Sequence, residues 1–90
     1  MIVYNVLFKG VEQDVTPTVR PFVKFEMAEK FCELDAQSRR LKIRSTSGFT
    51  SGDENTVGSF VDFRCEDGAG NSYYYIIFVQ ELKGVYKYEE

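Results

Sequence analysis

Apolar residues recur at every second position in several short stretches, and this pattern is the strongest constraint on how the chain folds. In residues 59–66, Val61, Phe63 and Cys65 alternate with charged residues. A period of two places the apolar side chains on one face of an extended strand. The pattern therefore predicts half-buried β-strands.

Other stretches also have the character of strands. Residues 2–9 are apolar on both faces, which is typical of a central strand, and residues 73–80 contain the longest apolar run of the chain. Residues 31–35 and 41–45 are interpreted as the two arms of a hairpin. A short last strand is expected at residues 85–88.

The stretch at residues 19–27 allows two interpretations. Its alternation favours a strand, with Pro21 placed at the edge of a sheet. The competing interpretation is a helix over residues 21–36, with Pro21 in its first turn and an apolar stripe that includes Ala28 and Cys32. The strand is the interpretation that we favour.

Together these segments predict a mainly β domain of six to seven short strands, arranged as a small antiparallel sandwich or barrel. The alternative is an α+β fold with one helix near residues 21–36. The 90 residues are expected to form a single domain, residues 1–90, with a long polar loop at residues 45–59. The high aromatic content, 16%, also favours β structure.

The sequence does not predict a membrane protein or a secreted one. The longest apolar run, residues 73–79, is far shorter than the roughly 20 residues that a spanning helix needs. The first residues lack the basic and apolar regions of a secretory signal, so we expect a cytoplasmic protein. Cys32 and Cys65 are expected to be buried free thiols.

The residue inventory excludes most catalytic templates. The chain has no histidine, so a Ser-His-Asp triad or a Cys-His pair cannot be built within it. Two cysteines far apart in the sequence do not have the ligand spacing that is typical of a zinc site. We therefore expect a non-enzymatic protein with no catalytic residues, no metal and no cofactor.

Charge is unevenly distributed along the chain. Residues 1–45 carry eight Lys/Arg and six Asp/Glu, a balance of +2, whereas residues 46–90 carry three and eight, a balance of −5. The acidic half argues against a general nucleic-acid binder, while the basic half leaves room for a local anion site.

One candidate site is a basic stripe. Arg40, Lys42 and Arg44 share one face of an extended strand, and Arg39 lies in the adjoining turn. With exposed rings such as Phe22 or Phe49 beside it, this stripe would suit single-stranded nucleic acid. The competing interpretation is an ordinary sheet surface on which these cations pair with acidic neighbours.

The other candidate site is a tyrosine-rich face. Tyr73 and Tyr75 share one side of a strand, Tyr86 and Tyr88 lie on the expected last strand, and Phe49 in the loop supplies a second contact. Tyrosine is favoured at protein interfaces, although the same rings could instead fill the core. The sequence thus predicts a protein-binding or self-associating module, such as a subunit, adaptor, inhibitor or homodimer, that acts through this face or an edge strand. The alternative function is binding of single-stranded nucleic acid.

Overall fold

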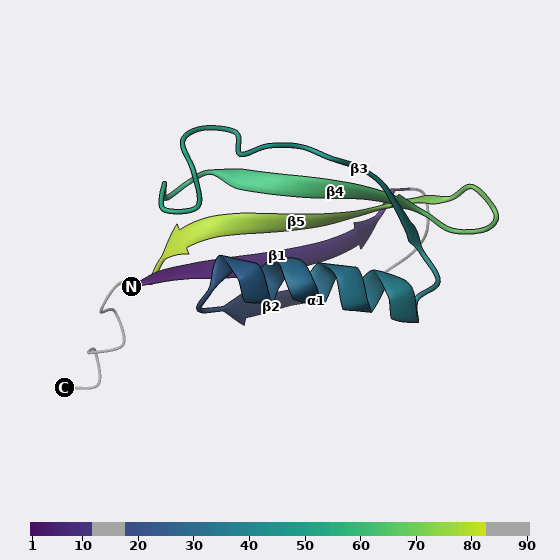
Figure 1. The fold of residues 1–90 in the computed structure, drawn as a ribbon, viewed down its shortest axis with the longest axis horizontal. Coiled ribbons are helices and arrows are strands. Elements are labelled where there is room, and N and C mark those ends of the chain that lie inside the picture. The colour runs from purple at the N-terminus through teal and green to yellow at the C-terminus, as the bar shows by residue number, and fades with distance from the viewer. Residues whose placement is uncertain (12–17, 83–90) are drawn as a thin grey trace.

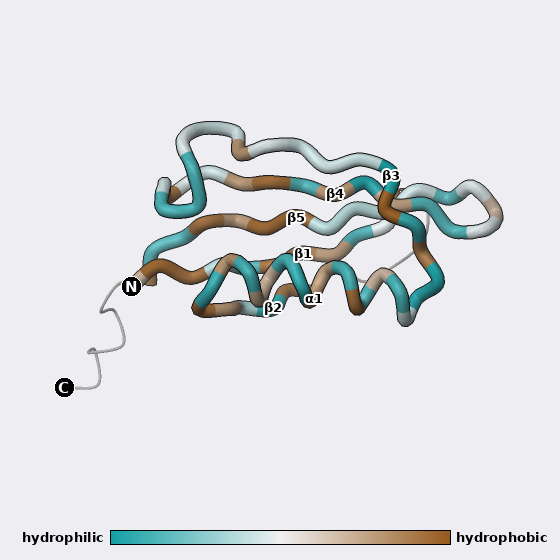
Figure 2. The backbone as a smooth tube through the Cα atoms, in the orientation of Figure 1, coloured by the Kyte–Doolittle hydropathy of each residue, from teal (hydrophilic) through white to brown (hydrophobic). Residues whose placement is uncertain are grey.

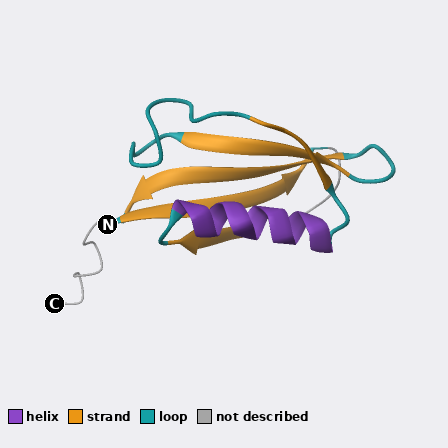
Figure 3. Ribbon diagram, in the orientation of Figure 1, coloured by secondary structure: helices purple, strands orange, loops and turns teal. Residues whose placement is uncertain are grey.

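The fold is built on one open antiparallel sheet. The structure, a computed structural model, describes residues 1–11 and 18–82. These residues form five strands in the order β2-β1-β5-β4-β3, with a helix against one face of the sheet (Figure 1, Figure 3). In chain order the elements are β1 (Ile2–Gly10), β2 (Thr18–Phe22), α1 (Phe25–Ser38), β3 (Lys42–Thr46), β4 (Phe60–Glu66) and β5 (Ser72–Glu81).

This architecture matches the alternative predicted from the sequence, an α+β fold with one helix. The sandwich or barrel of six to seven strands is not confirmed, because the described residues form a single open five-stranded sheet. The predicted strand at residues 85–88 lies outside the described residues. Within the described part of the chain, no helix has the length and apolar character needed to cross a membrane.

The helix replaces two predicted strand segments. The strand interpretation of residues 19–27 holds only for β2, since α1 begins within this stretch. Residues 31–35, the predicted hairpin arm, are also helical. The apolar spacing there is helical, because Ala28, Cys32 and Ala36 recur every fourth residue and all three are buried. Their small side chains let α1 lie close to the sheet.

The C-terminus of α1 is closed by a Schellman motif. The N–H of Leu41 donates to the carbonyl of Ala36 at 2.8 Å, and the N–H of Arg40 donates to that of Gln37 at 3.0 Å. Arg40 adopts the left-handed conformation, with φ of 60°. Glycine is the usual residue at this position because a Cβ disfavours that conformation. The motif reverses the chain, and β3 starts directly afterwards.

The core lies between α1 and the inner face of the sheet. β1, β4 and β5 supply most of it, and Figure 2 shows hydrophobic stretches along these strands. The buried core residues are Tyr4, Val6, Phe8, Ala28, Cys32, Ala36, Val61, Cys65, Tyr75, Ile77 and Val79. The strands at the centre of the sheet are thus those with the strongest apolar character in the sequence.

The two cysteines are free and buried, as predicted. Burial raises the pKa of Cys32 to about 12 and that of Cys65 to about 11. Both thiols therefore stay protonated near neutral pH, and they act as small core residues.

The long polar connection between β3 and β4 is folded against the sheet. Phe49 packs against Phe25 of α1, with ring centroids 5.2 Å apart. The hydroxyl of Tyr4 donates to the carbonyl of Glu54 at 2.9 Å, and Ser59 is completely buried. The loop at residues 45–59 thus contributes to the core.

Replacement of Arg40 by glycine is expected to stabilise the fold. Arg40→Ala is the matched control, because it removes the same charge but keeps the Cβ. The Cβ in a left-handed residue costs about 1 kcal/mol, and the greater freedom of glycine in the unfolded chain offsets part of the gain. We expect Arg40→Gly to exceed Arg40→Ala by about 0.5–1 kcal/mol in the free energy of unfolding, measured with urea. Equal values would contradict backbone strain at this position.

Candidate functional site

One polar contact links the helix to the centre of the sheet. Tyr75 is fully buried, and its hydroxyl donates to Oδ2 of Asp35 at 2.5 Å. Nε of Arg39, one turn further along α1, donates to the same oxygen at 2.7 Å. Burial disfavours the charged form of Asp35, but the hydrogen bonds from Tyr75 and Arg39 outweigh it and hold the pKa of this carboxyl below its ordinary value of 3.8.

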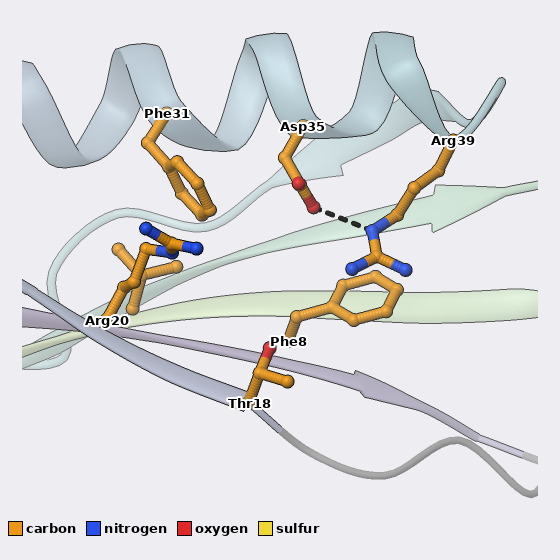
Figure 4. A pocket seen from close by; sticks show the side chains of 7 residues that line it. Phe8, Thr18, Arg20, Phe31, Asp35 and Arg39 are labelled. Carbon is orange, nitrogen blue, oxygen red and sulfur yellow. Dashed lines mark hydrogen bonds and ion pairs between the residues drawn. The ribbon is translucent and has the colours of Figure 1, made fainter.

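A small cavity opens beside this contact, between α1 and strands β1 and β2 (Figure 4). Its volume is about 120 Å³. The lining residues are Val6, Phe8, Thr18, Arg20, Phe31, Asp35 and Arg39. Two guanidinium groups therefore reach the cavity from different elements, and one carboxylate lies between them.

Each guanidinium lies against an aromatic ring. Cζ of Arg39 is 4.1 Å from the centroid of Phe8, and Cζ of Arg20 is 5.4 Å from that of Phe31. Arg39 is paired with Asp35, whereas Arg20 forms no ion pair with any residue that the structure describes. The sequence does not indicate that Arg20 lines a cavity with Arg39, because the approach of Arg20 to α1 depends on the pairing of β2 with β1.

The basic stripe is partly assembled. Arg40, Lys42 and Arg44 line one cleft of about 290 Å³, together with Glu66, Asp67 and Gly68. Nε of Arg44 donates to Oε1 of Glu66 at 3.2 Å. Arg39, the fourth predicted member, turns instead to Asp35. Two acidic residues, Glu66 and Asp67, thus share the cleft with the cations.

The aromatic rings expected beside the stripe lie elsewhere. Phe22 packs against Phe31, with ring centroids 5.3 Å apart, and Phe49 packs against Phe25. Tyr73 lies in a neighbouring hollow with Arg39, and its hydroxyl donates to Asp67 at 3.1 Å. Neither phenylalanine named in the sequence analysis lines the basic cleft.

The predicted tyrosine face is the inner face of the sheet. Tyr75 is fully buried, and Tyr73 is partly buried against the core and stacks on Phe8 at 5.8 Å. Their expected exposure is therefore corrected, and the core-filling interpretation describes both rings. β5 is apolar on both faces, so the sequence does not show which face a helix covers. Tyr86 and Tyr88 lie outside the described residues.

The opposite face of the sheet, here called the outer face, is also apolar. Its apolar side chains do not belong to the core cluster, and they are Val3, Leu7, Val19, Phe60, Tyr74, Ile76 and Phe78. Leu7 lies between Val19 and Ile76 in the strand register. Phe60 pairs with Phe78, with ring centroids 5.5 Å apart. Val3 is buried, Val19 is 61% exposed, and the other side chains of this set are half-buried.

Both edge strands are poorly suited to pairing with another strand. Pro21 removes a backbone donor from β2. β3 carries the charged residues Lys42 and Arg44 and has a register shift between Ile43 and Ser45. Charge, proline and bulges are features that protect sheet edges from strand addition.

Neither a known protein family, nor a curated protein, nor a solved structure matches this chain. Across residues 1–11 and 18–82, no group of three or more carboxylate or thiol side chains is placed to hold a metal ion. Among the described residues, we consider three surfaces as candidate sites: the outer face, the basic cleft and the Arg20–Arg39 cavity.

Replacement of Tyr75 by phenylalanine is expected to destabilise the protein at neutral pH. Tyr75→Phe keeps the ring but removes a hydrogen bond to a charged acceptor, worth about 1.5–3 kcal/mol. Folding lowers the pKa of Asp35, so the charged carboxylate stabilises the fold in full at any pH above its pKa in the unfolded chain. This stabilisation is lost as the pH falls through the lower pKa that Asp35 has in the folded state. The difference between wild type and variant should therefore narrow in acid.

The measurement is the free energy of unfolding in urea over a pH series from neutral to below 3.8. Tyr74→Phe is the control, because it removes a hydroxyl from the outer face of the same strand. A Tyr75→Phe variant with the same pH profile as Tyr74→Phe would contradict the assigned role of this hydroxyl.

Proposed function

We propose that this protein is a non-enzymatic protein-binding module whose contact surface is the outer face of its sheet. One observation carries the proposal: both faces of the central strands are apolar, but α1 covers only one of them. A solvated face of an antiparallel sheet normally carries polar residues. Leu7, Ile76 and Phe78 stand on the outer face instead, and contiguous apolar surface of this kind marks protein contact sites.

The outer face has the organisation of an interface. Its apolar centre is flanked by charged residues of both signs, Lys9, Asp62 and Arg64. Neighbouring strands lie about 4.8 Å apart and each residue of a strand adds about 3.3 Å of length, so the face of this five-stranded sheet has an area of roughly 600 Å². A standard interface uses about 800 Å² of each partner. The outer face is therefore of a suitable size for one partner.

A second copy of the chain is the partner that we favour. Asp62 and Arg64 lie two residues apart on β4 and face the same side. A two-fold axis near β4 would bring opposite charges of the two copies together around the apolar centre. Two sheets packed face to face at about 10 Å are a common arrangement in proteins. Addition of an edge strand, the other mode considered, has less support because both edges are protected.

Ile76→Arg is expected to weaken self-association by about tenfold or more, because it places an unpaired charge at the centre of the contact. The measurement is sedimentation equilibrium over a concentration series. Leu34→Arg is the matched control, since Leu34 is 53% exposed on α1, away from the sheet. Both variants should retain the wild-type circular-dichroism spectrum.

Two results would contradict this proposal. One is a wild-type chain that stays monomeric up to millimolar concentration. The other is equal self-association of Ile76→Arg and Leu34→Arg.

A second candidate function is the binding of single-stranded nucleic acid at the basic cleft. It is favoured by the convergence of Arg40, Lys42 and Arg44 on one cleft. The acidic neighbours Glu66 and Asp67 weaken the field there, and for this reason it ranks second.

If this candidate is correct, affinity for a single-stranded oligonucleotide falls with salt. Three phosphate contacts predict a slope of about −2 in a plot of log affinity against log salt concentration. Lys42→Glu should abolish binding, measured by fluorescence anisotropy. Lys30→Glu on α1 makes the same change of charge at a lysine that pairs with Glu33 and should have little effect. Binding that is unaffected by Lys42→Glu would exclude this function.

A further inference from the structure

We propose that the cavity between α1, β1 and β2 binds a compact oxyanion, the phosphate or carboxylate end of a small molecule. Arg20 enters the cavity from β2, and Arg39 enters it from the end of α1 (Figure 4). Thr18 adds a hydroxyl to the same lining. Guanidinium groups present paired donors that match the oxygens of phosphate and carboxylate groups.

Arg39 is held in place before any ligand arrives. Its Nε binds Asp35, which in turn accepts the hydroxyl of the buried Tyr75. The guanidinium also lies 4.1 Å from the centroid of Phe8. Asp35 and Tyr75 are thus positioning residues, and a pre-oriented donor loses less freedom when it binds.

The charge of the cavity favours an anion. Its two arginines and one aspartate give a local balance of +1, although the whole chain carries −3. Asp35 already has its partners, whereas Arg20 has no ion pair among the described residues. Val6 and Phe31 add apolar surface to the lining, while Thr18, Arg20 and Arg39 remain accessible to solvent and to an incoming ion.

The volume limits the size of the ligand. The cavity volume of about 120 Å³ corresponds to about four water molecules, because each molecule occupies roughly 30 Å³ in liquid water. It is well below the roughly 300–1,000 Å³ of sites that enclose a drug-sized molecule. The site therefore accepts the charged end of a molecule rather than the whole of it.

The orientation of Arg20 is the main structural support for a ligand. Arg20 pairs in register with Val6, so it lies on the inner face of the sheet. An inward-pointing charge on an edge strand also discourages strand addition. Those two roles differ in one measurable respect, because only an oxyanion site gives saturable binding that depends on Arg20.

The test is titration of the protein with sodium phosphate, and separately with sodium acetate, followed by two-dimensional ¹H–¹⁵N NMR at constant ionic strength. We expect saturable shifts of the amides in residues 18–22 and 35–39 with at least one of the two ions. Arg20→Gln should weaken this binding by about tenfold or more and leave the Asp35–Arg39 pair intact. Arg44→Gln is the matched control, because it removes one arginine from the basic cleft, and it should bind like wild type.

Saturation by phosphate or by acetate supports the site and identifies the ligand group. Three results would overturn it: no saturable shift with either ion, equal binding by Arg20→Gln and wild type, or shifts confined to the basic cleft and weakened by Arg44→Gln. The site lies on the inner side of the sheet, so Ile76→Arg should bind the ion like wild type. Failure of the outer-face proposal is therefore distinguishable from failure of this one.

Discussion

The buried hydroxyl of Tyr75 needs a partner inside the core, and Asp35 of α1 is that partner. A phenol left without a hydrogen bond in this position would cost about 1–3 kcal/mol. The contact therefore fixes where α1 lies along β5. Asp35 lies one turn before the end of the helix, near Arg39, which stacks over Phe8, and Arg40, where the chain reverses. The cavity and the first residues of β3 depend on that same placement.

The local pattern of apolar residues was sufficient to predict the central strands of the sheet, but it was not sufficient to predict the helix. β1, β4 and β5 follow directly from alternating or continuous apolar residues in the sequence. The segment around Phe25 satisfies a period of two and a helical period at once, so its conformation is decided by packing. The small residues Ala28, Cys32 and Ala36 fit a helix that lies close to the sheet, and this fit selects the helical period.

The candidate sites also differ in whether neighbouring residues in the sequence were enough to predict them. The spacing of Arg40, Lys42 and Arg44 predicted one shared surface, and the three line one cleft. Arg20 and Asp35 line the same cavity only because β2 folds back on β1 before α1 begins, and no local pattern records that placement. For β5, the choice between its two apolar faces also depends on the distant helix.

The two protected edges disfavour growth of the sheet by addition of a strand from another molecule. Pro21 in β2 and the irregular, charged β3 prevent the hydrogen-bonded ladder from continuing into another molecule. If two copies associate through the outer face as proposed, α1 on the opposite side of each sheet limits the stack to two sheets.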